Sequence, residues 1–77
     1  METKIHIGEI IKQKLHDRDL PVAWLARQVN CNESNFNKKL KNNIIAIDLL
    51  FRISKVLRED FFALYSEQLN LNAQNLP

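Results

Sequence analysis

Cysteine, glycine and proline are scarce in this chain, whose 77 residues include one cysteine, one glycine and two prolines. Because Cys31 is alone, no intrachain disulfide can form. A single thiol and an N-terminus unlike a signal peptide are typical of the reducing cytoplasm, where we expect the protein to reside. No apolar stretch approaches the roughly 20 residues that cross a bilayer. The fold must therefore depend on packing the apolar residues, which are 45% of the sequence.

Motifs of catalysis and of ligand binding are absent as well. The sequence has no glycine-rich phosphate loop, no metal-ligand spacing and no Ser/His/Asp set on separate elements. His6 and His16 have no carboxylate–histidine motif between them, so they do not indicate a metal site. A chain this short also lacks the volume for a typical ligand pocket of roughly 300 Å³ or more. We expect no enzymatic activity, cofactor, metal ion or small-molecule ligand.

The apolar residues repeat at helical spacing, and strict alternation of apolar and polar residues is absent. Residues 6–17 are predicted to form a first helix, and Pro21 suits the opening of a second, where its missing N–H is no loss. Asn32 is expected to cap a third helix, Asp48 to lie near the start of a fourth, and Asp60 to cap a short fifth. The residues predicted to face the core from the first, second and fourth helices are Ile7, Ile10, Ile11, Leu15, Val22, Leu25, Ala26, Val29, Leu49, Leu50, Ile53, Val56 and Leu57. The predicted fold class is therefore all-α, a compact bundle of about five short helices.

One domain accounts for most of the sequence. Residues 1–66 are predicted to form it, and the polar, asparagine-rich residues 67–77 are expected to fray as a tail. The fifth helix carries more apolar residues than one short helix needs to bury. Two explanations stay open for them, closure of the core and a homodimer surface. The residues concerned are Phe61, Phe62, Leu64 and Tyr65.

A sharp turn is predicted between the second and third helices. A turn of three or four residues between short helices is typical of a helix-turn-helix, in which the helices cross at roughly 90 to 120°. Such a turn usually needs one residue in the left-handed region, and asparagine tolerates that region best after glycine. Asn30 occupies the required place, and Ala26 is small enough for the helices to approach closely. Cys31 should then point inward as a small apolar residue rather than act as a nucleophile.

From Ile7 to about Tyr65 the chain resembles the phage-repressor (Cro/Xre-type) helix-turn-helix proteins, and within them a group of short bacterial regulators. No single matching segment is specific, but the order and spacing of the segments together are. The resemblance, from Ile7 to about Tyr65, extends over about three quarters of the chain. The matching segments are IGEII (7–11), LA (25–26), VNCN (29–32), SNF (34–36), ISKVL (53–57) and DFFALY (60–65).

The resemblance implies a sequence-specific DNA-binding regulator of transcription. In that family the third helix, here about residues 32–41, enters the major groove while the second crosses the DNA backbone. Asparagine can bond adenine, lysine can reach guanine or a phosphate, serine can donate or accept, and glutamate can accept from cytosine. The residues that the resemblance assigns to DNA binding are Asn32, Glu33, Ser34, Asn37, Lys38 and Lys41.

Charge is unevenly distributed along the chain, although the net charge is only +2. Residues 1–26 carry equal numbers of basic and acidic side chains. Residues 27–58 carry seven basic side chains against two acidic ones, and residues 59–77 carry three acidic side chains. The positive charge therefore surrounds the proposed recognition helix, as expected for a protein that binds DNA.

Three positions depart from the family pattern, and two of them, Val22 and Glu33, support an alternative function. Val22 stands where the family commonly has a glutamine that bonds a phosphate, and Glu33 brings negative charge toward a polyanion. Lys39 stands at a usually apolar position, so Leu40 is expected to take over the packing. The alternative is a protein-interaction module of the same fold, such as an antitoxin-like subunit, that does not bind DNA.

Overall fold

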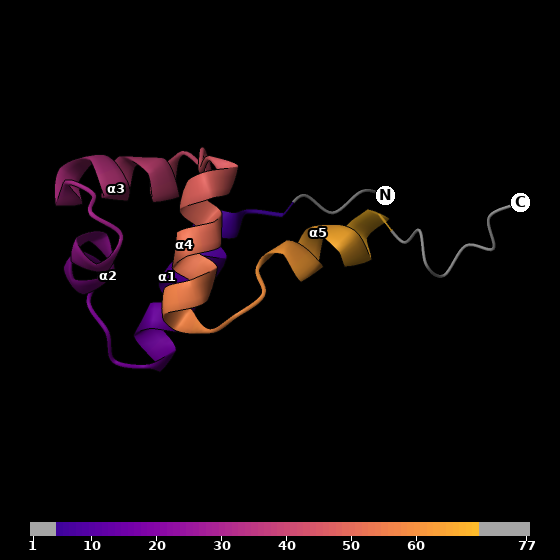
Figure 1. Cartoon of the computed structure of the whole chain (residues 1–77), viewed down its shortest axis with the longest axis horizontal. Helices are drawn as coiled ribbons and strands as arrows, with labels where there is room; N and C mark the ends of the chain where they lie inside the picture. The colour runs from indigo at the N-terminus through magenta and orange to yellow at the C-terminus, as the bar shows by residue number, and fades with distance from the viewer. Residues whose placement is uncertain (1–4, 70–77) are drawn as a thin grey trace, which may run out of the picture.

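Residues 5–69, the part of the chain that the computed structural model describes, form five helices and no strand (Figure 1). The predicted all-α class is therefore confirmed. The first helix was predicted to begin one residue earlier than it does, and Pro21 precedes the second helix as its N-cap. The helices are α1 (Ile7–Asp17), α2 (Val22–Gln28), α3 (Glu33–Lys41), α4 (Ile47–Leu57) and α5 (Phe62–Leu69).

The core is formed by apolar side chains from α1 to α4 together with one residue that precedes α5. Three residues predicted to face the core, Ile10, Val22 and Val56, are only half-buried and pack against its edge. Full burial of a large aliphatic or aromatic side chain contributes about 1.5–3 kcal/mol, so this cluster supplies most of the driving force for folding. The buried residues are Ile7, Ile11, Leu15, Leu25, Ala26, Val29, Phe36, Leu40, Leu49, Leu50, Ile53, Leu57 and Phe61.

The first four helices end without glycine. Each is followed by a residue in the left-handed region with φ between 56° and 58°. After α1, α2 and α3, the amides of the left-handed residue and of the residue that follows it donate to carbonyls in the last turn of the helix. This arrangement is a Schellman motif, and it satisfies carbonyls that the helix leaves free. Asparagine and aspartate tolerate this conformation better than most residues, which explains how a chain with one glycine makes so many tight turns. The left-handed residues are Asp19, Asn30, Asn43 and Arg58.

The single glycine lies where α1 crosses α3. A Cβ atom added to Gly8 would lie 1.8 Å from the carbonyl oxygen of Leu40, so only glycine allows this close approach. The amide of Gly8 donates to Oδ1 of Asn43 at 3.2 Å, and Nδ2 of Asn43 donates to the carbonyl of Ile5 at 3.2 Å. The left-handed backbone of Asn43 therefore terminates α3, and its side-chain amide binds the backbone at the start of α1.

A second set of contacts joins the end of α1 to the segment after α4. The Arg18 guanidinium donates to the carbonyl of Leu57 at 2.6 Å and to the carboxylate of Glu59 at 2.8 Å. Lys14 lies 3.7 Å from the same carboxylate. Because these side chains are partly exposed, each ion pair contributes only about 0–1 kcal/mol. Their main effect is to fix the direction in which the chain leaves α4.

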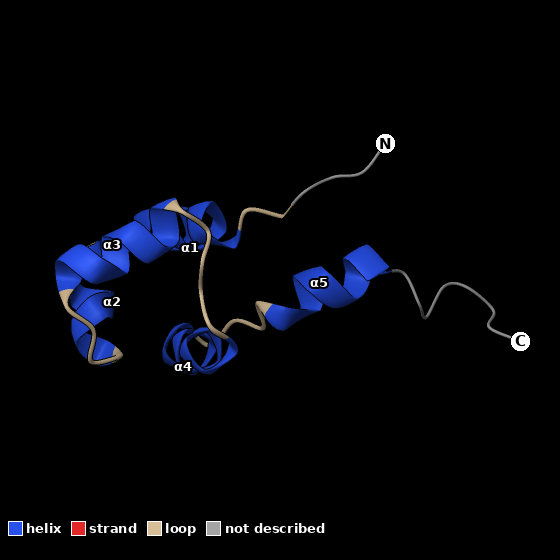
Figure 2. Ribbon diagram, turned by 90° about the horizontal axis from the view of Figure 1, so that it is seen from above, coloured by secondary structure: helices blue, strands red, loops and turns tan. Residues whose placement is uncertain are grey.

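The fifth helix projects away from α1, α2 and α3 (Figures 1 and 2). Asp60 caps it, because its Oδ1 accepts from the amides of Phe62 and Ala63, as predicted. None of the residues in α5 is buried, and only Phe61, just before the helix, enters the core, with 2% of its surface exposed. Phe61 must therefore be removed from the predicted dimer surface, because the core already covers its ring. Residues 67–69 belong to α5, while the rest of the predicted tail, 70–77, lies outside the described residues.

Candidate functional site

Helix α3 is held by its apolar side and presents a polar side to solvent. Phe36 and Leu40, four residues apart, are completely buried, and the helix packs against both α1 and α2. Lys39 is exposed, so Leu40 takes over the packing as expected from the sequence. At the start of the helix, Oδ1 of Asn32 accepts from the amide of Asn35 at 3.1 Å, which confirms the predicted N-cap. Because α3 packs on two other helices, its exposed face is presented in one fixed orientation.

The structure brings the six predicted site residues together on or beside the exposed side of α3. Five are exposed, and Asn37 is half-buried, with Nδ2 donating to the carbonyl of Glu33 at 3.1 Å. This bond uses one of the two Nδ2 hydrogens, so the second hydrogen and Oδ1 can still meet a partner. Glu33 lies in the first turn, where its carboxylate stabilises the positive end of the helix dipole. Asn35, which was not predicted as a site residue, is also exposed on this helix.

The lysines of α3 are not engaged in ion pairs in the described structure. Between residues 5 and 69, both salt bridges involve Glu59, which pairs with Lys14 on α1 and with Arg18, the residue that follows α1. Lys38, Lys39 and Lys41 are all exposed in the last turn of α3, where they also favour the negative end of the helix dipole. Three unpaired cations in one turn form a strong local positive charge that can attract a polyanion.

The turn before α3 contains the left-handed residue that the sequence predicted. Asn30 has φ of 58°. The amide of Cys31 donates to the carbonyl of Ala26 at 2.8 Å, and the amide of Asn30 donates to the carbonyl of Arg27 at 3.2 Å. Cys31 packs partly buried against the core, also as predicted. The direction of α3 relative to α2 therefore depends on one residue that holds a left-handed conformation.

We expect opposite effects from two substitutions in this turn. Asn30→Gly should be neutral or mildly stabilising, because glycine adopts the left-handed region without a steric penalty. Asn30→Val should destabilise the protein by about 1–3 kcal/mol, because a β-branched residue is strained there. Thermal melts measure both, and Asn42→Val is the matched control, since Asn42 has an ordinary φ of −88°. Equal stability of Asn30→Val and the parent would contradict this account of the turn.

Sequence reasoning missed the contact that ties the turn to α4. The guanidinium of Arg52 donates to the carbonyl of Val29 at 3.2 Å. Val29 is the C-cap of α2, so this bond satisfies a carbonyl that the helix leaves free. In the sequence Arg52 could be counted only as a positive charge, because its partner is 23 positions away. The bond helps α4 to position the segment between α2 and α3.

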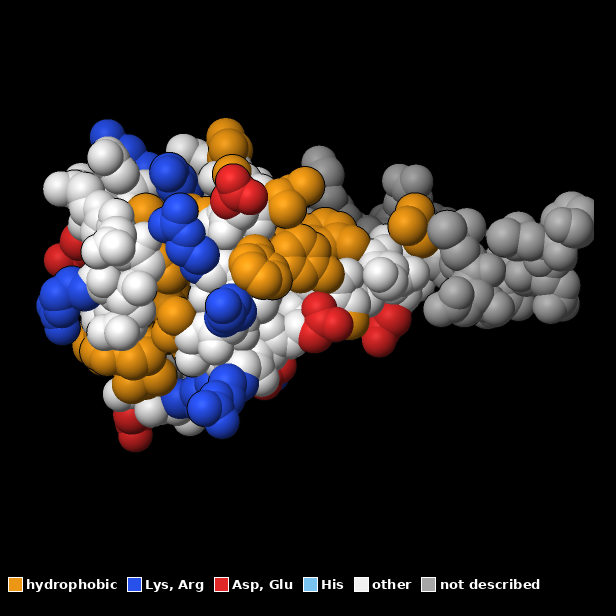
Figure 3. Space-filling model, viewed as in Figure 1, with side chains coloured by type: hydrophobic (Ala, Val, Ile, Leu, Met, Phe, Trp, Pro, Cys, Tyr) orange, Lys and Arg blue, Asp and Glu red, His pale blue; other side chains and the backbone are white. Residues whose placement is uncertain are grey.

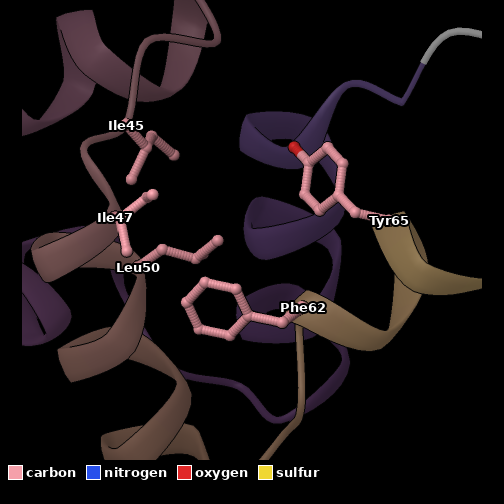
Figure 4. A pocket seen from close by; sticks show the side chains of 5 residues that line it. All are labelled: Ile45, Ile47, Leu50, Phe62 and Tyr65. Atoms are coloured by element: carbon pink, nitrogen blue, oxygen red, sulfur yellow. The ribbon is translucent and has the colours of Figure 1, made fainter.

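A second feature is an apolar groove between α4 and α5 (Figure 4). Its volume is about 260 Å³. Neither the groove nor the loop residue in its wall was predicted from the sequence. The lining side chains are Ile45, Ile47, Leu50, Phe62 and Tyr65.

Within residues 5–69 no group of three or more His, Cys, Asp or Glu side chains is placed to hold a metal ion. None of the five described helices is both long and apolar enough to span a membrane. Compared with protein families, with curated proteins and with solved structures, the chain gives no match. Any assignment of function therefore depends on the geometry and chemistry of α3 and of the groove.

Proposed function

We propose that this chain is a cytoplasmic, sequence-specific DNA-binding regulator of transcription that uses α2 and α3 as a helix-turn-helix. The observation that carries the proposal is the exposed side of α3. Its amide and hydroxyl groups are followed by three lysines that form no ion pair with any of residues 5–69. This side belongs to a helix whose opposite side is anchored in the core by Phe36 and Leu40. A rigid helix with polar side chains outward and positive charge beside them fits the major groove of DNA.

Each residue of the proposed site has a chemical role in this arrangement. Asn37, in the middle of α3, could bond the edge of an adenine, and Ser34 could donate to or accept from a base. Lys38 and Lys41 could bond phosphates or guanine, and Glu33 could accept from cytosine. Asn32 has its Oδ1 committed to the helix cap, so its contribution would come from Nδ2. The protein would act by binding alone, without catalysis or a cofactor.

The second candidate function is that of a protein-interaction module that keeps the fold but does not bind DNA. The apolar groove between α4 and α5 favours it, since grooves of this kind bind other protein segments. Val22 favours it too, because this side chain is half-buried against the core and can offer no hydrogen bond to a phosphate. The unpaired lysines of α3 oppose it, because an apolar groove alone gives no reason for their accumulation.

A change at Asn37 tests whether α3 reads bases. The preferred site is first found by selection from random duplexes. Asn37→Ala should then weaken binding to that site by about 1–3 kcal/mol and relax the preference at one base pair.

The comparison variant for Asn37→Ala is Lys55→Ala on α4. Lys55 is exposed, and its ammonium lies 5.5 Å from the centroid of the Phe51 ring. If Lys55→Ala alters DNA binding, it should weaken binding to specific and random duplexes equally. Titrations with the selected and a scrambled duplex measure both variants. Equal losses on the two duplexes for Asn37→Ala would remove this residue from the base-reading set. Failure to select any duplex would favour the protein-interaction function.

A further inference from the structure

The unit formed by α2, the turn and α3 is attached to the rest of the chain mainly by apolar side chains. Apolar contacts hold this unit in place but are not directional, whereas a hydrogen bond requires its donor and acceptor to be aligned. The orientation of α3 is therefore most sensitive to the few polar contacts that the unit makes with other helices. The buried side chains of the unit are Leu25, Ala26, Val29, Phe36 and Leu40.

Within residues 5–69, a single hydrogen bond joins α4 to this unit. The guanidinium of Arg52 donates to the carbonyl of Val29 at 3.2 Å. Because the donor is charged, the bond contributes more than one between neutral groups, and the positive charge also favours the negative end of the α2 dipole. Val29 immediately precedes Asn30, the left-handed residue at which the chain turns toward α3. Arg52 therefore acts at the point from which the direction of α3 is set.

The opposite end of α3 is attached to α1 by Asn43. This residue comes two positions after the last residue of the helix. Its Oδ1 accepts from the amide of Gly8 and its Nδ2 donates to the carbonyl of Ile5, both at 3.2 Å. The recognition helix is thus held by a side chain of α4 before it begins and by contacts with the start of α1 after it ends.

We propose that Arg52 is a positioning residue for DNA recognition, which sets the orientation of α3 without touching the DNA, and that Asn43 has the same role at the other end. The proposal rests on DNA binding through α3. Groups that read bases must be held within about 0.5 Å and 10–20° of the productive geometry. Contacts from lysines to phosphates position the protein without reading sequence. A small rotation of α3 should therefore reduce sequence preference more than general affinity for DNA.

The competing role for Arg52 is a direct contact with a phosphate. Figure 3 shows Lys and Arg side chains on the face that carries α3 and α4, so the charge of Arg52 does not separate the two roles. Their consequences differ. A phosphate contact raises the affinity for every sequence and adds about 0.9 to the slope of log affinity against log salt. A positioning residue changes the ratio of the affinities for selected and scrambled duplexes, and leaves the slope unchanged.

A comparison of Arg52→Met with Lys55→Met tests the proposal. Methionine removes the charge and the donors but keeps an unbranched side chain. Lys55 is exposed on the same helix and, among the described residues, forms no hydrogen bond with α2, the turn or α3. Fluorescence anisotropy with the selected and scrambled duplexes at several salt concentrations gives the ratio and the slope. Partial unfolding lowers both affinities by the same factor, so the ratio does not depend on stability.

Arg52→Met should lower the affinity ratio at least about fivefold, the lower end of what one bidentate base contact contributes, with the slope of the parent. Lys55→Met should leave the ratio unchanged. Asn43→Gly should also lower the ratio, because glycine keeps the left-handed backbone but removes both side-chain bonds to α1. An unchanged ratio in Arg52→Met would overturn the proposal. Equal losses on the two duplexes, with a slope reduced by about 0.9, would make Arg52 a phosphate contact instead.

Hydrogen exchange without DNA separates failure of this proposal from failure of the DNA-binding function. The amide of Cys31 donates across the turn to the carbonyl of Ala26 at 2.8 Å. It should exchange at least about threefold faster in Arg52→Met than in Lys55→Met, because the turn opens more easily without the bond to α4. Equal exchange rates would show that Arg52 does not hold the turn, even if the parent binds DNA. Faster exchange in a parent chain that binds no DNA would refute only the DNA-binding function.

Discussion

Gly8→Ala is expected to destabilise the protein by about 3 kcal/mol, the upper end of the range for an overpacked core. Within a helix this substitution would normally stabilise by roughly 0.5–1 kcal/mol, because alanine has the higher helix propensity. Here the added Cβ would lie 1.8 Å from the carbonyl oxygen of Leu40, and a backbone atom cannot rotate out of the way as a side chain could. The helices α1 and α3 would have to separate.

Urea denaturation followed by circular dichroism measures the change in the free energy of unfolding for Gly8→Ala. Gln13→Ala is the matched control on the exposed side of the same helix, and it should change stability by less than about 0.5 kcal/mol. A stabilising effect of Gly8→Ala would show that α1 and α3 do not cross closely at this residue. Because α3 carries the proposed DNA-binding residues, the displacement of α3 that Gly8→Ala forces should also weaken any specific DNA binding.

Phe61→Ala is expected to cost about 3–5 kcal/mol, enough to unfold much of the protein. Phe61 is only 2% exposed and is the single buried residue of the segment after α4. Its removal would leave a large cavity in the core, and would free the base of α5. Phe51→Ala is the matched control, because it deletes the same ring from a side chain that is 56% exposed.

Thermal melts of Phe61→Ala and Phe51→Ala should be recorded at a few micromolar, so that any dimer contributes little. Phe51→Ala should then change stability by less than about 1 kcal/mol. Similar losses for the two variants would mean that Phe61 does not close the core. A much larger loss for Phe61→Ala than for Phe51→Ala would show that the Phe61 ring closes the core.

Features set by neighbouring residues were predicted correctly from the sequence. The cap at Asn32, the left-handed Asn30 and the cap at Asp60 all depend on hydrogen bonds that span at most five residues. Such bonds are determined by local chemistry, which a sequence displays directly. The residues of the proposed site on α3 came from the family resemblance, and the structure buries Phe36 and Leu40 on the opposite side of the helix.

Features set by distant residues could not be predicted in the same way. Asn43 bonds to Gly8 over 35 positions and Arg52 bonds to Val29 over 23, and neither pairing has a local signature. The burial of Phe61 depends on the direction of the chain after the left-handed Arg58, so the sequence did not show which aromatic ring would enter the core. The groove was missed for the same reason, since its walls meet only in the folded chain.

The proposed recognition surface leads to a quantitative expectation for DNA binding. The four exposed basic side chains of α2 and α3 are Arg27, Lys38, Lys39 and Lys41. If about four phosphates are neutralised, the logarithm of the association constant should fall with the logarithm of salt concentration with a slope near −3.6. Affinity should then decrease roughly 150-fold between 50 and 200 mM salt.

The salt dependence of binding to a random duplex is the most direct measurement of DNA binding by this chain. Fluorescence anisotropy of a labelled duplex at several salt concentrations gives the slope for the parent and for a variant with both Lys38→Ala and Lys41→Ala. The account predicts about −3.6 for the parent and about −1.8 for the double variant. An affinity that does not depend on salt, an unchanged slope in the double variant, or no binding at low salt would contradict it.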